Sequence, residues 1–164
     1  MSAYGINVTV HVFAAVFWLG GLFHLALVGA PVLRRVEPDS LRAELFRRLG
    51  ERSRTAGWIA LGILVLTGIE NLRVRGLLTG AVLGDPGFWR EPYGRVLAWK
   101  LGAVVFMLVV QALHDFVVGP RASGLDASSP EAALIRRRAA WLARLSAVAG
   151  VVILIAAVRL ARGL

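Results

Sequence analysis

The stretch RVLAWKLGAVVFMLVVQALHDF, residues 95–116, decides the fold because it is long and apolar enough to cross a bilayer as a helix. At about 100° per residue, four of its side chains share one stripe of that helix: Lys100, Met107, Gln111 and His114. An ionisable group in hydrocarbon costs about 3 kcal/mol or more. We therefore expect the stripe to face the interior of a helix bundle and to form one wall of a cofactor or metal site.

The composition indicates an integral membrane protein. Hydrophobic residues make up 57% of the 164 residues, and the mean hydropathy is +0.69, both too high for an ordinary soluble domain. The net charge of +9 would suggest nucleic acid for a soluble protein, but loop topology explains it in a membrane protein, so no nucleic-acid partner is expected. The chain has no cysteine, which excludes disulfides, thiolate metal sites, iron–sulfur clusters and thioether-linked haem.

Four apolar runs predict an all-α fold, a single transmembrane domain over residues 1–164 arranged as an up-down-up-down four-helix bundle. Pro31 is expected to stop the first helix, and an arginine-rich amphipathic helix is expected in the first connection, separate from the second span. The predicted spans are residues 5–29, 57–74, 96–118 and 140–160, with the amphipathic connection over residues 39–54.

The distribution of basic residues predicts the orientation of these spans. The first and third connections together carry twelve basic residues, and the opposite side carries seven. Because positively charged loops stay in the cytoplasm, we expect both termini outside the cytoplasmic membrane.

Lys100 is the only lysine among 19 basic residues. Burial lowers the pKa of a lysine, and the neutral amine can then bind a metal, which a guanidinium cannot do. The alternative is a chance lysine in an arginine-rich chain, with its ammonium group reaching the membrane interface.

Depth in the membrane relates residues that are distant in sequence. His11 and Lys100 each follow the start of an inward-running helix by about six residues, so both should lie at one outer level. Glu70 and Asn71, near the end of the second span, should reach the same level and could orient a ligand there. For Glu70, a solvated helix end is the simpler interpretation.

Two further histidines lie deeper on the same helices. His24 and His114 follow His11 and Lys100 by about 20 Å of helix, which makes them a candidate second metal site at an inner level. The two levels resemble those of diheme b-type cytochromes, although His24 is turned about 140° from His11 around the helix. The alternative is a pair of histidines near the lipid headgroups.

The face of the first helix that carries His11 also carries Trp18, with Ala14 and Ala15 between them. Small residues at this place leave room for a bulky group. They are also typical of close helix packing, and the sequence leaves both interpretations open.

The first helix carries a family resemblance. His11, the run Trp18-Leu19-Gly20-Gly21, then Pro31, Leu33 and Arg34 are similar to the signature of the copper resistance protein D domain, a four-helix membrane module, and the similarity extends through Trp99 and Lys100. The chain also resembles the related HemJ-type protoporphyrinogen oxidases, which bind haem b through a histidine in the first helix and a lysine in the third. The resemblance implies His11 and Lys100 as the ligands. HemJ proteins have polar and aromatic residues where this chain has apolar residues 25–30, which argues against protoporphyrinogen oxidation.

Three functions remain open at this stage. The first is a haem b protein with one or two haems and a redox or electron-transfer role. In it, His11 and Lys100 would bind the iron. The residues around them would be Trp18, Met107 and Gln111 beside the ring, and Glu70 and Asn71 as supports of the ligands. The second is copper transport or resistance through His11, His24, Met107 and His114. The third is a non-catalytic assembly component.

The expected partners are the lipid bilayer, a quinone or redox protein, and a second copy of the chain. No acid–base or nucleophile constellation is present, so any enzymatic activity would be haem-dependent oxidoreduction.

Overall fold

The computed structural model describes residues 2–123 and 129–162, and every regular element in these ranges is helical. Residues 124–128, within the connection expected before the last span, lie outside the described part. Four helical stretches are long and apolar enough to cross a membrane: Ala3–Leu33, Asp39–Val74, Pro92–Arg121 and Ala133–Ala161. The predicted all-α membrane fold is confirmed. The contacts divide the chain into two units, residues up to Gly84 and residues from Asp85 onward.

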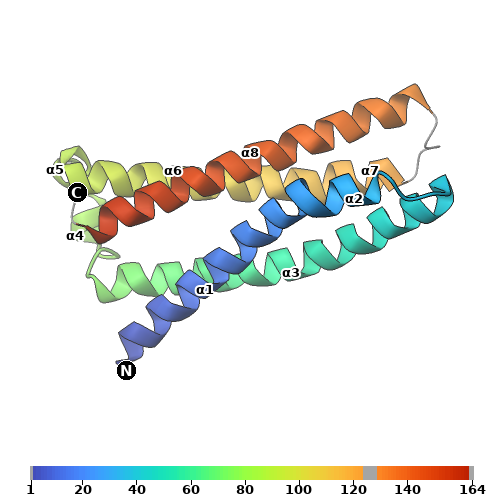
Figure 1. Cartoon of the computed structure of the whole chain (residues 1–164). Helices are drawn as coiled ribbons and strands as arrows, with labels where there is room; N and C mark the ends of the chain where they lie inside the picture. The colour runs from blue at the N-terminus through green and yellow to red at the C-terminus, as the bar shows by residue number, and fades with distance from the viewer. Residues whose placement is uncertain (1, 124–128, 163–164) are drawn as a thin grey trace. The chain divides into compact units, whose positions relative to one another are not determined.

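The first unit is an antiparallel helical hairpin (Figure 1). Its first arm consists of α1 (Ala3–His24), η1 (Leu25–Gly29) and α2 (Ala30–Leu33), and its second arm is α3 (Asp39–Val74). Ser2 caps α1 by accepting a hydrogen bond from the Gly5 amide at 3.2 Å. A short helix, α4 (Gly80–Leu83), follows α3.

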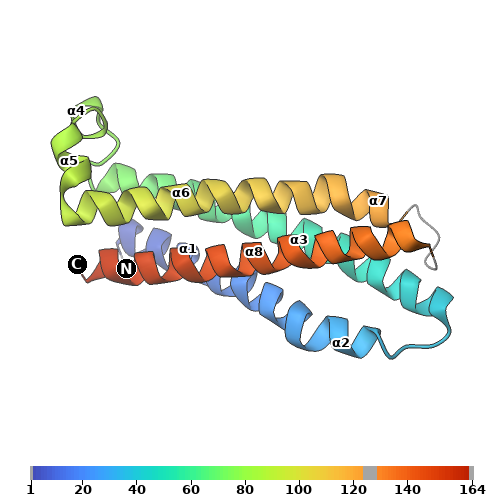
Figure 2. The same cartoon turned by 90° about the horizontal axis from the view of Figure 1, so that it is seen from above.

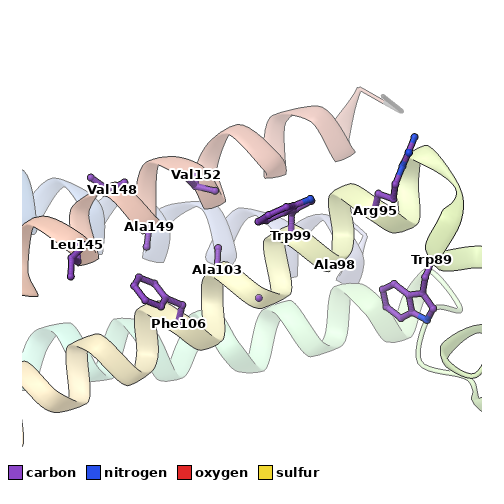
Figure 3. A pocket seen from close by; sticks show the side chains of 11 residues that line it. Trp89, Arg95, Ala98, Trp99, Ala103, Phe106, Leu145, Val148, Ala149 and Val152 are labelled. Atoms are coloured by element: carbon purple, nitrogen blue, oxygen red, sulfur yellow. The ribbon is translucent and has the colours of Figure 1, made fainter. Parts of the chain in front are cut away.

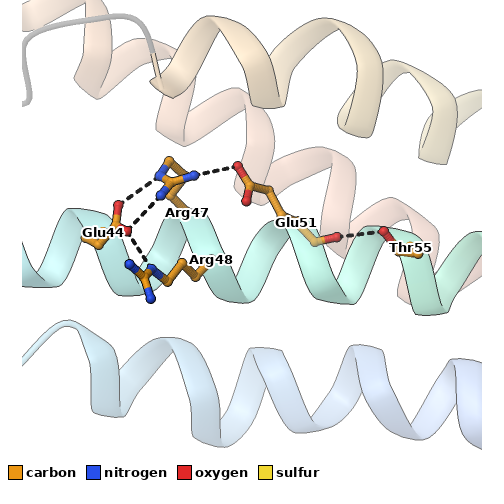
Figure 4. Close-up of polar contacts among 5 residues, drawn as sticks. All are labelled: Glu44, Arg47, Arg48, Glu51 and Thr55. Atoms are coloured by element: carbon orange, nitrogen blue, oxygen red, sulfur yellow. Dashed lines mark hydrogen bonds and ion pairs between the residues drawn. The ribbon is translucent and has the colours of Figure 1, made fainter.

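The structure corrects the expectation of a separate amphipathic helix over residues 39–54. These residues and the apolar residues that follow form one helix of 36 residues, α3. No proline interrupts the junction, and a glycine such as Gly57 costs a helix only about 1 kcal/mol. Ion pairs one turn apart hold the arginine-rich half: Arg47 with Glu44 and Glu51, and Arg48 with Glu44 (Figure 4). The two arginines lower the pKa of Glu44 to about 2.

Pro31 does not end the first helix as expected. The π-helical segment η1 precedes it, and the Ala30 amide bonds to the Leu25 carbonyl, five residues back. In a wider π turn the hydrogen-bond register shifts, so the helix passes a proline that has no N–H to donate. Pro31 then sits in the first turn of α2, and the helical path continues to Leu33.

The second unit contains a second antiparallel hairpin (Figure 2). Its first arm consists of α6 (Pro92–Ala112), η2 (Leu113–Val118) and α7 (Gly119–Ser123), and its second arm is α8 (Pro130–Ala161). Here too a π segment precedes a proline by two residues, Pro120. The helices of this hairpin meet through small and apolar buried side chains: Leu97, Met107, Val110, Ala149 and Ala156.

A short helix, α5 (Pro86–Arg90), packs against the start of α6. Asp85 caps α5 by accepting a hydrogen bond from the Gly87 amide at 2.8 Å. A Cβ at Gly94 would overlap the Phe88 carbonyl oxygen, so only glycine allows this close approach. The contact fixes α5 beside the beginning of the third span.

Large apolar side chains cover the outward faces of the long helices. Phe13, Leu27 and Leu66 expose 70% or more of their surface. A soluble protein would hide such side chains, whereas lipid solvates them without cost. The chain is an integral membrane protein whose helices associate with the bilayer.

Candidate metal or cofactor site

Four polar residues of the first unit meet at the contact between α1 and α3: Asn7, His11, Thr67 and Asn71. His11 on α1 lies against Thr67 on α3, with 2.7 Å between the His11 Nδ1 and the Thr67 Oγ1. Gly68 of α3 lies beside the imidazole, because a Cβ there would be in ordinary van der Waals contact with the His11 Cε1, at 3.5 Å. The histidine ring is therefore held at the interface of two membrane helices.

The partners of Thr67 determine which nitrogen of His11 carries the proton. The Thr67 hydroxyl lies 2.6 Å from the Ile63 carbonyl oxygen, which can only accept a hydrogen bond. The single hydroxyl proton is donated to that carbonyl, as is usual for threonine within a helix. The His11 Nδ1–H consequently donates to the Thr67 oxygen, and the lone pair of the neutral ring lies on Nε2. A second group that fixes the tautomer in this way is typical of metal-binding histidines.

Asn7 extends this polar contact by one helical turn. Its side-chain amide donates to the Thr67 carbonyl and to the Asn71 Oδ1, both at 3.0 Å. Asn71, a predicted site residue, thus lies one turn from His11 within the same line of hydrogen bonds. One turn further on, Arg75 donates to the Tyr4 hydroxyl.

Sequence reasoning missed Asn7 and Thr67, although a signal was present. Asn7 precedes His11 by four residues, and Thr67 precedes Asn71 by four, so each pair shares one helix face. In an antiparallel hairpin, two such pairs are brought together in opposite order. A search for polar residues four apart on neighbouring spans would have found them.

Two other predicted site residues of the first unit, Glu70 and Trp18, lie outside this line of hydrogen bonds and have contacts of their own. Glu70 forms a bidentate ion pair with Arg73 on its own helix, 2.7 Å for each bond, and is more than a third exposed. Trp18 is buried with Ala14, and its ring lies 4.0 Å from the place a Gly57 Cβ would occupy on α3. Trp18 therefore lies against α3 where that helix carries a glycine.

His24 stands apart from this interface. It is an exposed residue in the last turn of α1, directly before the π segment η1. No hydrogen bond or ion pair joins its side chain to another described residue. Its surroundings differ sharply from those of His11.

The polar stripe of the second unit has a buried carboxylate near its end. Asp115 is only 6% exposed and accepts hydrogen bonds from the Gln111 side-chain amide and the His114 Nδ1, each at 2.8 Å. In the neutral form of the His114 ring, this pairing places the lone pair on Nε2, as for His11. Sequence reasoning missed Asp115 because adjacent residues of a regular helix point about 100° apart. The π segment η2 contains both His114 and Asp115.

The other stripe residues differ in burial. Met107 is buried, at 4% exposure, and Lys100 is half-buried about two turns earlier on α6. Within the described ranges, no three histidine or carboxylate side chains converge as a ready-made metal site. The arrangement offers single imidazoles with fixed tautomers and one buried thioether.

Comparison with known proteins gives two matches. The family model described as copper resistance protein D matches residues 43–160, which contain Lys100, Met107 and His114 but begin after His11 and His24. An uncharacterized protein of Aquifex aeolicus (strain VF5) is 31% identical over 113 residues, which are 68% of this chain and 68% of that protein. No solved structure matches the chain.

Proposed function

Because the chain belongs to the copper resistance protein D family, we propose that it handles copper as its cargo within the membrane, with His11 as an imidazole ligand. The observation that carries the proposal is the hydrogen bond from His11 to Thr67. It presents the Nε2 lone pair of a neutral imidazole inside a membrane hairpin, and imidazole is a good ligand for copper.

The donor chemistry of the second unit supports the same function. Met107 supplies a thioether, which favours Cu(I), and His114 is oriented by a buried carboxylate. In this proposal each of these side chains would bind the ion as it passes through the membrane.

Haem b is the second candidate, and His11 and Lys100 are the residues that would hold its iron. The donor set fits, because a neutral imidazole with its lone pair on Nε2 is a standard haem ligand. One observation favours it specifically: the only lysine of an arginine-rich chain lies half-buried in a membrane helix. A bound haem would supply one-electron chemistry, with a quinone or a redox protein as the partner.

The proposed location follows from the charge distribution. The arginine-rich half of α3 lies in the cytoplasm, and both termini lie outside the cytoplasmic membrane. Copper would then meet His11 near the outer surface.

The experiment that separates the two candidates is a metal analysis combined with an absorption spectrum. The full chain is purified in detergent from cells supplied with both copper and haem. Copper in proportion to protein, without a Soret band, is the expected result. A Soret band with sharp α and β bands after reduction, and no copper, would replace the copper proposal with the haem one. In that case Lys100→Arg should abolish haem binding while the protein still inserts into the membrane.

A further inference from the structure

A groove runs along the second hairpin between α6 and α8 (Figure 3). It has a volume of about 570 Å³ and lies wholly within the second unit. Small residues of both helices line it: Ala98, Gly102 and Ala103 of α6, and Ala149 of α8. Phe106 and Leu145 border its deep end, so the groove is apolar along most of its length.

The other end of the groove is polar and aromatic. Arg95, Trp89 and Trp99 lie there, beside α5 (Figure 3). Tryptophan is enriched where a membrane helix meets the headgroups, and Trp99 is 76% exposed. The groove therefore opens at the interface and runs into the hydrocarbon.

The length of the groove matches one leaflet of a bilayer. Arg95 and Phe106 are eleven residues apart on one helix, which corresponds to about 16 Å at 1.5 Å per residue. Half of a hydrocarbon core of ~30 Å is about 15 Å. A single acyl chain that is anchored at the headgroup level would reach from one end of the groove to the other.

Arg95 determines the charge of the occupant. It is the only charged residue that lines the groove, its side chain is exposed, and it forms no ion pair with a carboxylate of the described residues. A guanidinium at the headgroup level attracts anionic lipid phosphates.

We propose that this groove binds an anionic phospholipid, with one acyl chain between α6 and α8 and the phosphate at Arg95. The lipid fills the space over the small residues and holds this end of the hairpin at the headgroups of one leaflet. The proposal is independent of which metal or cofactor the protein carries.

The test uses the full chain in phosphatidylcholine vesicles that contain an increasing fraction of phosphatidylglycerol with brominated acyl chains. Bromine quenches nearby tryptophans, so Trp89 and Trp99 report occupancy of the groove. Brominated phosphatidylcholine serves as the neutral comparison. We expect phosphatidylglycerol to quench at an about fivefold lower mole fraction, equivalent to about 1 kcal/mol for one arginine near the surface.

Two variants and two matched controls locate the binding. Arg95→Gln should remove the preference for phosphatidylglycerol, whereas Arg159→Gln, at the end of α8 and outside the groove lining, should keep it. Gly102→Leu should fill the groove and weaken quenching by both lipids. Gly62→Leu on α3 is the matched control and should leave the quenching unchanged, because it adds the same side chain outside the groove. The two sites are comparable, since a Cβ meets no neighbour within 4 Å at either glycine.

Three outcomes would overturn the proposal. Equal quenching by the two lipids would show an apolar groove without headgroup selection, as for a quinone. A preference that survives Arg95→Gln would place the anion elsewhere. Quenching that Gly102→Leu leaves unchanged would mean that the groove is covered, for example by a second copy of the chain.

Discussion

At the scale of single residues, the sequence identified the ionisable groups but not the partners that orient them. His11 and His114 stand out as imidazoles in apolar runs, and Asn71 stands out as a polar residue near the end of the second predicted span. Thr67 is inconspicuous in such a run, yet its hydroxyl determines the tautomer of His11. Partners of this kind follow from the register of two helices against each other, which one sequence does not specify.

The hydrogen bond between His11 and Thr67 predicts the behaviour of a subtle variant. Thr67→Val keeps the shape of the side chain but removes the acceptor, so copper affinity should fall about 10- to 100-fold, as for other outer partners of metal-binding histidines. Thr67→Ser keeps the hydroxyl and should bind normally. Competition with a chromophoric Cu(I) chelator measures both affinities. A valine variant with the affinity of the parent protein would remove Thr67 from the site.

Gly94 gives a second prediction, on stability. Gly94→Ala forces a methyl group into the Phe88 carbonyl, and overpacking of this kind typically costs about 1 to 3 kcal/mol. Gly102→Ala, where a Cβ meets nothing within 4 Å, is the matched control. Thermal unfolding in detergent, followed by circular dichroism, should show a lower midpoint for Gly94→Ala alone. Equal midpoints would show that α5 can move away from the added methyl group without any loss of stability.

At the scale of helices, apolar length predicted the four spans, and the structure altered their ends. The fusion of residues 39–54 with the second span needed no sequence signal beyond the absence of a helix breaker. Passage of a helix through Pro31 depended on the π turn before it. A π turn has no reliable sequence signature, so the proline alone predicted the wrong end. The recurrence of a π segment two residues before Pro120 makes this a shared feature of both hairpins.

The ion pairs of α3 predict a dependence on acid. Because Arg47 and Arg48 hold the folded-state pKa of Glu44 at about 2, below its usual 4.5, their contribution to stability is present above pH 4.5. It is lost as the pH falls toward 2. Helicity of the full chain in detergent should therefore drop over this window, and Glu44→Gln should reduce the drop. Glu91→Gln, which removes a carboxylate outside these ion pairs, should not. Equal acid profiles for all three proteins would contradict the role of Glu44.

At the scale of the whole molecule, composition and hydropathy established an all-helical integral membrane protein, and the family match established the copper resistance protein D family. The sequence alone favoured haem, because helix depth and the resemblance both paired His11 with Lys100. The family match supports copper instead, and it covers the stripe of the second unit. Which residues bind the copper stays a prediction, and His11 is the main residue in it.

The most direct test of the role of His11 is copper binding by two matched histidine variants, His11→Asn and His24→Asn. Both remove an imidazole from the same helix, but His11 lies in the hairpin interface and His24 is exposed. With Cu(I) titrated into the purified full chain, we expect His11→Asn to lose at least about 100-fold in affinity, more than the loss of an outer partner would cost. His24→Asn should bind as the parent protein does. Unchanged affinity in His11→Asn, or an equal loss in both variants, would contradict the assignment of His11 as the copper ligand.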